Sequence, residues 1–247
     1  MKILLRCGLL ALLCAARSLA GPTPDSLLGI TIVQSKNGGT VSVPMQIVVL
    51  LTLLTLLPAI LMSATPFLRI TVVLHFLRQA LGTQTTPSNQ VLAGLALFLS
   101  LIVMQPVAEQ VYKVGWDPLE RGQITPTQAW DRASDPIKTF LLRFAREKDI
   151  RLFLEISHVP LPAKPADVPL NALVPAYVLS ELKASFQIGA VLFLPFLVID
   201  LVVASVTLAI GMVQLPPVMI SAPFKILLFV LVDGWNLVVG SLVKSFY

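Results

Sequence analysis

The sequence has few charged residues and few of the side chains that usually carry chemistry. Charged residues make up 13% of its 247 residues, whereas about 25% is typical of a soluble domain. It has only two cysteines and two histidines. Both cysteines, Cys7 and Cys14, lie within the first 20 residues, and the histidines, His75 and His158, are far apart in the sequence. These shortages argue against a clustered metal site and against a cysteine nucleophile.

Catalytic motifs and a strong charge bias are also missing. The H-E-x-x-H, G-x-S-x-G and P-loop spacings do not occur. The formal charge of +5 includes three basic residues within positions 1–20, and the remainder holds 15 basic and 13 acidic residues. Nucleic-acid binding depends on excess positive charge, which this balance does not provide. We therefore expect no enzyme activity, no cofactor and no nucleic-acid partner.

Long apolar blocks are what the sequence has instead, because 56% of its residues are hydrophobic. A span of the bilayer core needs about 20 such residues in a helix. Residues 1–20 have a basic start, a short apolar run and small residues at Ser18 and Ala20, a pattern typical of a secretory signal peptide. We expect residues 21–43 to form an extracytoplasmic arm and residues 44–107 to form a first hydrophobic hairpin.

The first hairpin contains apolar blocks at 45–64 and 90–107, and we expect the second block to end at Pro106. Between them, residues 66–81 predict a helix with one polar side, on which Thr71, His75, Arg78 and Gln79 lie. Gly82 is expected to stop this helix, and Ser88 lies in the segment expected to cap the next one.

Residues 108–185 contain ten basic and ten acidic residues, which predicts a helical domain outside the membrane. The capping-box spacing from Thr125 to Gln128 predicts one helix, and Asp135-Pro136 suggests the start of a second. On the second helix, we expect Glu147 to pair with both Arg143 and Arg151 at i, i+4 spacing. A proline-rich linker follows, and a further helix over 170–185 runs into the next apolar block.

Residues 186–247 form a second hydrophobic hairpin, interrupted by Gly211-Met212-Val213-Gln214-Leu215-Pro216-Pro217. Gly211 suits a helix end, and the double proline prevents the helix from continuing. The loop Met212 to Pro217 either reaches the far side of the membrane as a plain turn or lines a passage.

Isolated charges in this apolar region allow two interpretations. Asp200, Lys225 and Asp233 could form a proton path, as in a small-solute or proton transporter subunit, or they could be ion pairs that fix how helices dock within the chain or between copies. Glu181 and Lys183 precede the third apolar block at i, i+2 spacing, so each is expected to find a partner elsewhere.

Two long motifs are similar to the FliP family of flagellar export proteins. The first is PAILMSATPFLRITVVLHFLRQALGTQTTPSNQVLAGLALFL (58–99), and the second covers residues 174–246 and includes PFLVIDLVVASV and PFKILLFVLVDGW. The segment AREKD (145–149) also fits the family. The related injectisome subunit usually lacks a cleavable signal and an N-terminal arm, so their presence favours the flagellar branch.

The resemblance implies an all-α protein of membrane-associated helical hairpins with an extracytoplasmic helical insertion, assembling into a helical oligomeric pore. It implies a multi-pass inner-membrane protein at the flagellar basal body, present in several copies, a pentamer, with FliQ-like and FliR-like subunits. Unfolded rod, hook and filament proteins would pass through the pore. It also implies a constricting loop, rich in methionine in the family, at Met212, Val213, Gln214 and Leu215, and assembly contacts at Glu181 and Lys225.

Overall fold

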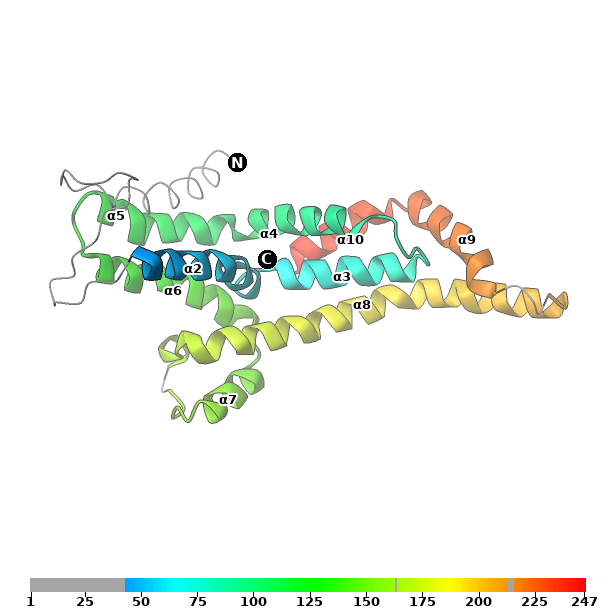
Figure 1. The fold of residues 1–247 in the computed structure, drawn as a ribbon. Helices are drawn as coiled ribbons and strands as arrows, with labels where there is room; N and C mark the ends of the chain where they lie inside the picture. The colour runs from blue at the N-terminus through cyan, green and yellow to red at the C-terminus, as the bar shows by residue number, and fades with distance from the viewer. Residues whose placement is uncertain (1–42, 163, 213–215) are drawn as a thin grey trace, which may run out of the picture. The chain divides into compact units, whose positions relative to one another are not determined.

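The computed structural model describes residues 43–162, 164–212 and 216–247, and every regular element in these ranges is helical (Figure 1). In chain order the elements are α2 (Val43–Ser63), α3 (Phe67–Ala80), α4 (Asn89–Val111), the π-helix η1 (Tyr112–Trp116), α5 (Asp117–Glu120), α6 (Pro126–Phe144), α7 (Glu147–Ile156), the 3-10 helix η2 (Pro165–Asp167), α8 (Leu170–Ala209), α9 (Pro217–Leu231) and α10 (Gly234–Lys244). The all-helical class is therefore confirmed for these ranges. The predicted signal peptide and nearly all of the predicted arm lie outside them.

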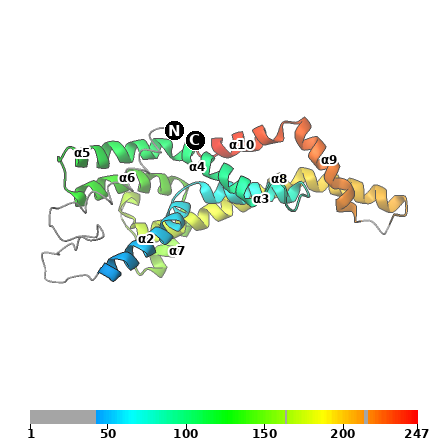
Figure 2. The same cartoon turned by 45° about the horizontal axis from the view of Figure 1, so that its top comes forward.

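The chain divides into two compact units, residues 1–60 and 61–247, and every contact described below lies within the second. Its longest element is α8, which has 40 residues and so measures about 60 Å at 1.5 Å per residue. Helix α3 lies alongside α8, as Figures 1 and 2 show. The core of the unit forms where these two helices meet.

The packing face of α3 follows the helical repeat of its apolar residues. Ile70, Val73, Leu74 and Leu77 occur at i, i+3, i+4 and i+7, and all four are fully buried. Burying each such side chain stabilises the fold by about 1.5–3 kcal/mol. The predicted polar residues of α3 lie on its other side and are exposed or half-buried, which confirms that the helix is amphipathic.

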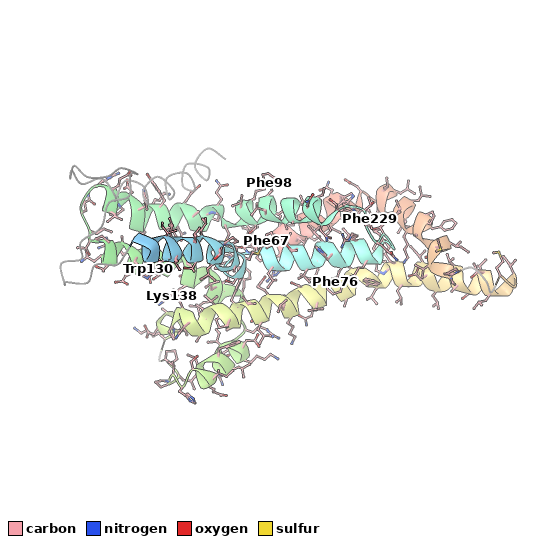
Figure 3. All side chains as sticks on the ribbon, in the orientation of Figure 1. Phe67, Phe76, Phe98, Trp130, Lys138 and Phe229 are labelled. Carbon is pink, nitrogen blue, oxygen red and sulfur yellow. The ribbon has the colours of Figure 1, made fainter. Side chains whose placement is uncertain are left out.

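A glycine allows α3 and α8 to approach closely. A Cβ atom added to Gly189 of α8 would lie 2.5 Å from Cδ2 and 3.1 Å from Cβ of Phe76 on α3. Phe76 also packs edge-on against Phe186, with ring centroids 5.3 Å apart (Figure 3). The absence of a side chain at Gly189 therefore makes room for this aromatic pair.

Several helix ends follow their predicted capping residues. Thr125 forms a complete capping box with Gln128 at the start of α6, and Ser88 caps α4 by accepting a hydrogen bond from the backbone of Val91. Gly82 has a positive φ of 76° directly after the C-cap of α3. These three predicted ends are confirmed.

Two prolines expected to mark helix boundaries lie inside helices instead. Helix α4 continues through Pro106 to Val111 and then into η1 and α5, so the predicted end at Pro106 is wrong. Helix α6 likewise runs through Pro136, so no second helix starts there. In α6 the reason is packing: its buried residues, Ala129, Phe140 and Leu141, lie on both sides of Pro136, and their burial stabilises an unbroken helix.

Of the two ion pairs predicted for Glu147, one forms and the other does not. Helix α6 ends at Phe144, and the next residue, Ala145, is extended, so Arg143 and Glu147 lie on different helices and their predicted pairing is wrong. Arg151 does pair with Glu147 within α7, at 2.6 Å. Both partners of that pair are well exposed, so it contributes at most about 0.5 kcal/mol.

Two helices within the described ranges are long and apolar enough to cross a membrane, namely 89–120 (32 residues) and Leu170–Ala209 (40 residues). The pair α9 and α10 would provide a third span if it acts as one element, although it bends by 67°. A shorter apolar stretch, Ile47–Leu56, lies in α2. The chain thus has the apolar helices of a membrane protein.

Candidate functional site

Helix α8 ends in a capped turn before the segment that leads to α9. Gly211 has φ of 80°, its N–H donates to the carbonyl of Leu208, and the N–H of Met212 donates to the carbonyl of Thr207, both at 3.0 Å. This pair of bonds is the Schellman arrangement, in which glycine supplies the left-handed residue. The predicted helix end at Gly211 is therefore confirmed.

Helix α9 resumes at Pro217, after an extended Pro216 that acts as its N-cap. Met212 is 41% exposed. Three of the four residues expected to constrict a pore, Val213, Gln214 and Leu215, lie outside the described residues. The described parts place Met212 and Pro216 at the two ends of the segment that joins α8 to α9.

A buried ion pair holds the two arms of this hairpin together. Lys225 Nζ on α9 donates to Asp200 Oδ2 on α8 at 2.6 Å, and Ser221 Oγ donates to Asp200 Oδ1 at 2.5 Å. The Lys225 side chain is 3% exposed and that of Asp200 is 31% exposed. An unpaired ammonium at this depth would be costly, so the pair explains how two charges are tolerated among apolar residues.

Aromatic rings support the same hairpin from within. Phe229 of α9, labelled in Figure 3, is 5% exposed. Its ring lies 6.4 Å from that of Phe196 of α8 and 5.4 Å from that of Trp235 of α10. The Trp235 contact is edge-to-face, the geometry that aromatic pairs favour. These contacts tie α8, α9 and α10 together a few residues beyond the ion pair.

Asp233 does not join Asp200 and Lys225. It is exposed, it has a positive φ of 52° at the bend between α9 and α10, and its Oδ2 accepts a hydrogen bond from Asn236 at 3.1 Å. A left-handed conformation is uncommon outside glycine but is tolerated by aspartate. The three charges singled out in the sequence therefore separate into one ion pair and one residue at a bend.

Glu181 has a partner that the sequence did not reveal. Arg69 of α3 contacts it through two hydrogen bonds, from Nε to Oε2 at 2.8 Å and from Nη2 to Oε1 at 2.5 Å. The Glu181 side chain is fully buried and that of Arg69 is 7% exposed. Lys183, two residues further on, is exposed, so these neighbours lie in different surroundings.

A second buried carboxylate joins α7 to α8, and the sequence did not single it out. Asp149 Oδ2 accepts hydrogen bonds from Ser180 Oγ at 2.6 Å and from Arg146 Nε at 2.8 Å, and the backbone N–H of Arg146 donates to Ser180 Oγ. Burial alone would raise the pKa of Asp149, but the hydrogen bonds from Ser180 and Arg146 favour the ionised form and leave its pKa lowered. This network attaches α7 to α8.

The outer faces of α8 and α9 are apolar, and the described residues of the chain leave them exposed. The large exposed residues on these faces include Leu194, Leu197, Leu201, Leu227, Val230 and Leu231, each between 55% and 75% exposed. Exposed apolar areas of this kind mark contacts with membrane or with other proteins. The hairpin thus has an ion pair between its two helices and an apolar exterior.

Metal-binding chemistry finds no support in the described part of the chain, where no group of three His, Cys, Asp or Glu side chains comes together. His75 is engaged locally, with Nδ1 lying 2.9 Å from the carbonyl oxygen of Thr71.

Comparison with known proteins shows the family directly. The FliP family profile matches residues 50–242. A flagellar biosynthetic protein FliP from Pectobacterium carotovorum is 52% identical over 90% of this chain and 86% of its own length. Those from Bacillus subtilis and Caulobacter vibrioides are 48% and 51% identical, over 88% and 81% of this chain and 98% and 76% of their own lengths. The ion-paired hairpin with its capped turn is therefore carried by a chain that belongs to the FliP family.

Proposed function

We propose that this chain is a core subunit of the export gate of the flagellar type III secretion apparatus. Several copies, a pentamer by the resemblance, assemble with FliQ-like and FliR-like subunits in the inner membrane at the flagellar basal body. The assembly surrounds a pore through which unfolded rod, hook and filament proteins pass. The name that the relatives share supports the flagellar role, and the helical hairpins support a place in a membrane assembly.

The observation that carries the proposal is the contrast between the inside and the outside of the α8–α9 hairpin. The Asp200–Lys225 pair is satisfied within one chain, so the hairpin keeps its form without a partner. Its outer faces leave large apolar side chains exposed. Such a hairpin is suited to stand beside copies of itself and beside lipid.

The joining segment then acts as the constriction of the pore. Met212 is a flexible apolar residue, and Leu215 is bulky and apolar, so together with Val213 and Gln214 they form a deformable seal that closes around a passing chain. The Schellman cap at Gly211 fixes where the joining segment begins, which keeps the seal at a constant height among the copies.

A small-solute or proton transporter is the alternative from another class. That function needs charges that line a route, and it would draw on Asp200, Lys225 and Asp233 together. Asp233 does not contact Asp200 or Lys225, and these two residues bind each other. Both observations favour the export gate over the transporter.

The proposal is tested in cells that carry a loop variant in place of the natural chain. Replacing Met212, Val213 and Leu215 together by alanine removes the bulk of the seal. We expect such cells to leak ions or small dyes when the secretion apparatus is assembled, while hook and filament proteins are still exported. Membrane permeability and secreted protein in the medium are the two measurements.

A matched control is Met219→Ala, which removes an exposed methionine of α9 (73% exposed) outside the joining segment and should leave permeability unchanged. Removing the chain altogether should abolish export and leave small-molecule uptake intact. Intact export after removal contradicts the gate proposal, and an unchanged leak in the triple variant contradicts the sealing role of the segment.

A further inference from the structure

Arg69 is bound on more sides than a simple ion pair requires. Its Nε and Nη2 atoms donate to Glu181, and its Nη1 atom donates to Ser245 Oγ at 3.1 Å. Its guanidinium also lies over the ring of Phe246, 4.1 Å from the centroid. One side chain of α3 therefore contacts both α8 and the residues that directly follow α10.

Helix α6 contributes to the same cluster from another side. The rings of Phe144 and Phe246 pack edge-on with centroids 5.3 Å apart, and the guanidinium of Arg69 lies 5.5 Å from the Phe144 ring. Arg143, the residue expected to pair with Glu147, donates instead to the backbone oxygen of Tyr247 at 2.6 Å. Phe246 is only 3% exposed as a result. We call Arg69, Glu181, Phe144, Ser245 and Phe246 the Arg69 clasp.

The middle of α10 is less firmly held than its end. A groove of about 510 Å³ lies between it and the helices α3 and α8, lined mainly by apolar residues that include Val73, Val191, Leu192, Leu237 and Val238. Leu237 is 59% exposed. At the other end of α10, the bend at Asp233 separates it from α9. Within the described residues, the clasp and the neighbouring Arg143–Tyr247 hydrogen bond therefore join the end of α10 to α3, α6 and α8.

We propose that Arg69 is a positioning residue, which holds the end of α10 in the clasp and thereby fixes the limb formed by α9 and α10. The limb is then anchored at two polar points, the Asp200–Lys225 pair near the joining segment and the clasp at its far end, with Asp233 at the bend between them. This inference deepens the proposed function and rests on it, because the limb begins at Pro217, at the end of the segment proposed to constrict the pore.

A plain Arg69–Glu181 ion pair is the competing explanation, and a charge exchange separates the two. The double variant Arg69→Glu and Glu181→Arg restores opposite charges between α3 and α8 but moves the cation to α8. The clasp needs the guanidinium on α3, where it contacts Ser245 and Phe246. The double variant should therefore fail to restore the docking of α10.

Docking is measured by the reactivity of one cysteine introduced as Leu242→Cys, with Cys7 and Cys14 replaced by serine. Leu242 is 2% exposed, so a membrane-permeant maleimide should label it slowly in otherwise wild-type protein in membranes. The Arg69→Lys variant loses the planar guanidinium, which forms two hydrogen bonds to Glu181 and stacks on Phe246. In this variant we expect labelling to be about tenfold faster. That ratio corresponds to about 1.4 kcal/mol, the scale of one desolvated cation–π contact.

Three controls make the result specific. A cysteine at Leu237 should label equally fast in both proteins, and one at Ala172, which is fully buried in α8, should stay protected in both. Arg78→Lys changes another arginine of α3, which contacts Pro87 and Asn89 instead of the clasp, and should leave labelling at position 242 slow. If Arg69→Lys exposes position 172 as well, Phe246→Leu is used to open the clasp without removing the ion pair.

Slow labelling at position 242 in both Arg69→Lys and Phe246→Leu would overturn the inference, and so would restored protection in the charge-exchange variant. The labelling needs no export, so the clasp can fail while the gate proposal stands. Export itself is scored separately in the same cells, where an open clasp is expected to lower secretion at unchanged protein abundance.

Discussion

The two halves of α8 meet different surroundings, although they belong to one continuous helix. Eight of its ten buried residues lie in 170–189, where α3 and α7 cover the helix, and only Phe196 and Thr207 are buried in 190–209. The first half carries the fully buried Glu181, whereas the second carries the partly exposed Asp200. The first half is completed by its own chain, and the second leaves most of its surface for other molecules to cover.

Under the proposed function, this difference allows one helix to be both an anchor within the chain and an element of the pore. At about 60 Å it is twice as long as a bilayer core is thick, so its ends do not share one environment. Packing in the first half is dense enough to need glycine at position 189. Among the described residues, the second half is joined to α9 by the Asp200–Lys225 pair and the Phe196–Phe229 contact, and its exterior is apolar, which under the proposed function suits contact with neighbouring copies.

The largest expected effect comes from removing the carboxylate of the covered half. Glu181→Ala leaves Arg69 buried without its counter-ion, which should cost about 3–5 kcal/mol of stability. Thermal unfolding of the detergent-solubilised protein should show a midpoint lowered by on the order of 10 °C. Lys183→Ala, an exposed position two residues away, is the matched control and should leave the unfolding midpoint nearly unchanged. Similar losses in both variants would remove the distinction between a buried and an exposed charge.

A smaller effect is expected in the uncovered half. Asp200→Ala removes the counter-ion of Lys225 and should cost about 1.5–3 kcal/mol. The cost is smaller than for Glu181 because the Asp200 side chain is 31% exposed, so its removal opens a path for water to the Lys225 ammonium, which is 3% exposed in the intact protein. The double variant Asp200→Leu and Lys225→Met should recover most of this stability and retain export. A double variant that is stable but inactive would favour the proton-path function instead.

The smallest of the three effects tests the close approach at the middle of α8. Gly189→Ala forces Phe76 to shift, since the new Cβ would lie 2.5 Å from its ring, and should cost about 1–2 kcal/mol. Gly94→Ala in α4 places its Cβ in open space and should be neutral or stabilising by up to about 1 kcal/mol. The difference between the two unfolding midpoints is the measurement, and equal midpoints would contradict the tight packing.

Local rules predicted the parts of the fold that depend on neighbouring residues. The caps at Ser88, Thr125 and Gly211 were readable because each depends on a few adjacent positions. Pro106 and Pro136 were expected to mark helix boundaries but lie inside helices. In α6, buried residues on both sides of Pro136 stabilise the unbroken helix. The amphipathic character of α3 was predicted correctly for the same local reason.

The candidate site depended on contacts that no spacing reveals. Asp200 and Lys225 stood out as charges in apolar surroundings, but that they pair with each other emerged only from the hairpin geometry. Arg69 was passed over because its partners, Glu181 and Ser245, lie 112 and 176 residues away. Asp149 was missed because its surroundings in the sequence are those of an ordinary solvated helix face, while Ser180 buries it from α8.

The central claim is that the uncovered half of α8, with its hairpin, is completed by other copies around a common pore. The most direct measurement is the mass of the protein purified in mild detergent, by light scattering coupled to size exclusion. We expect a particle several times the mass of one chain, with a central opening when it is imaged. A stable, well-folded monomer with the Leu201 face still covered only by detergent would contradict it.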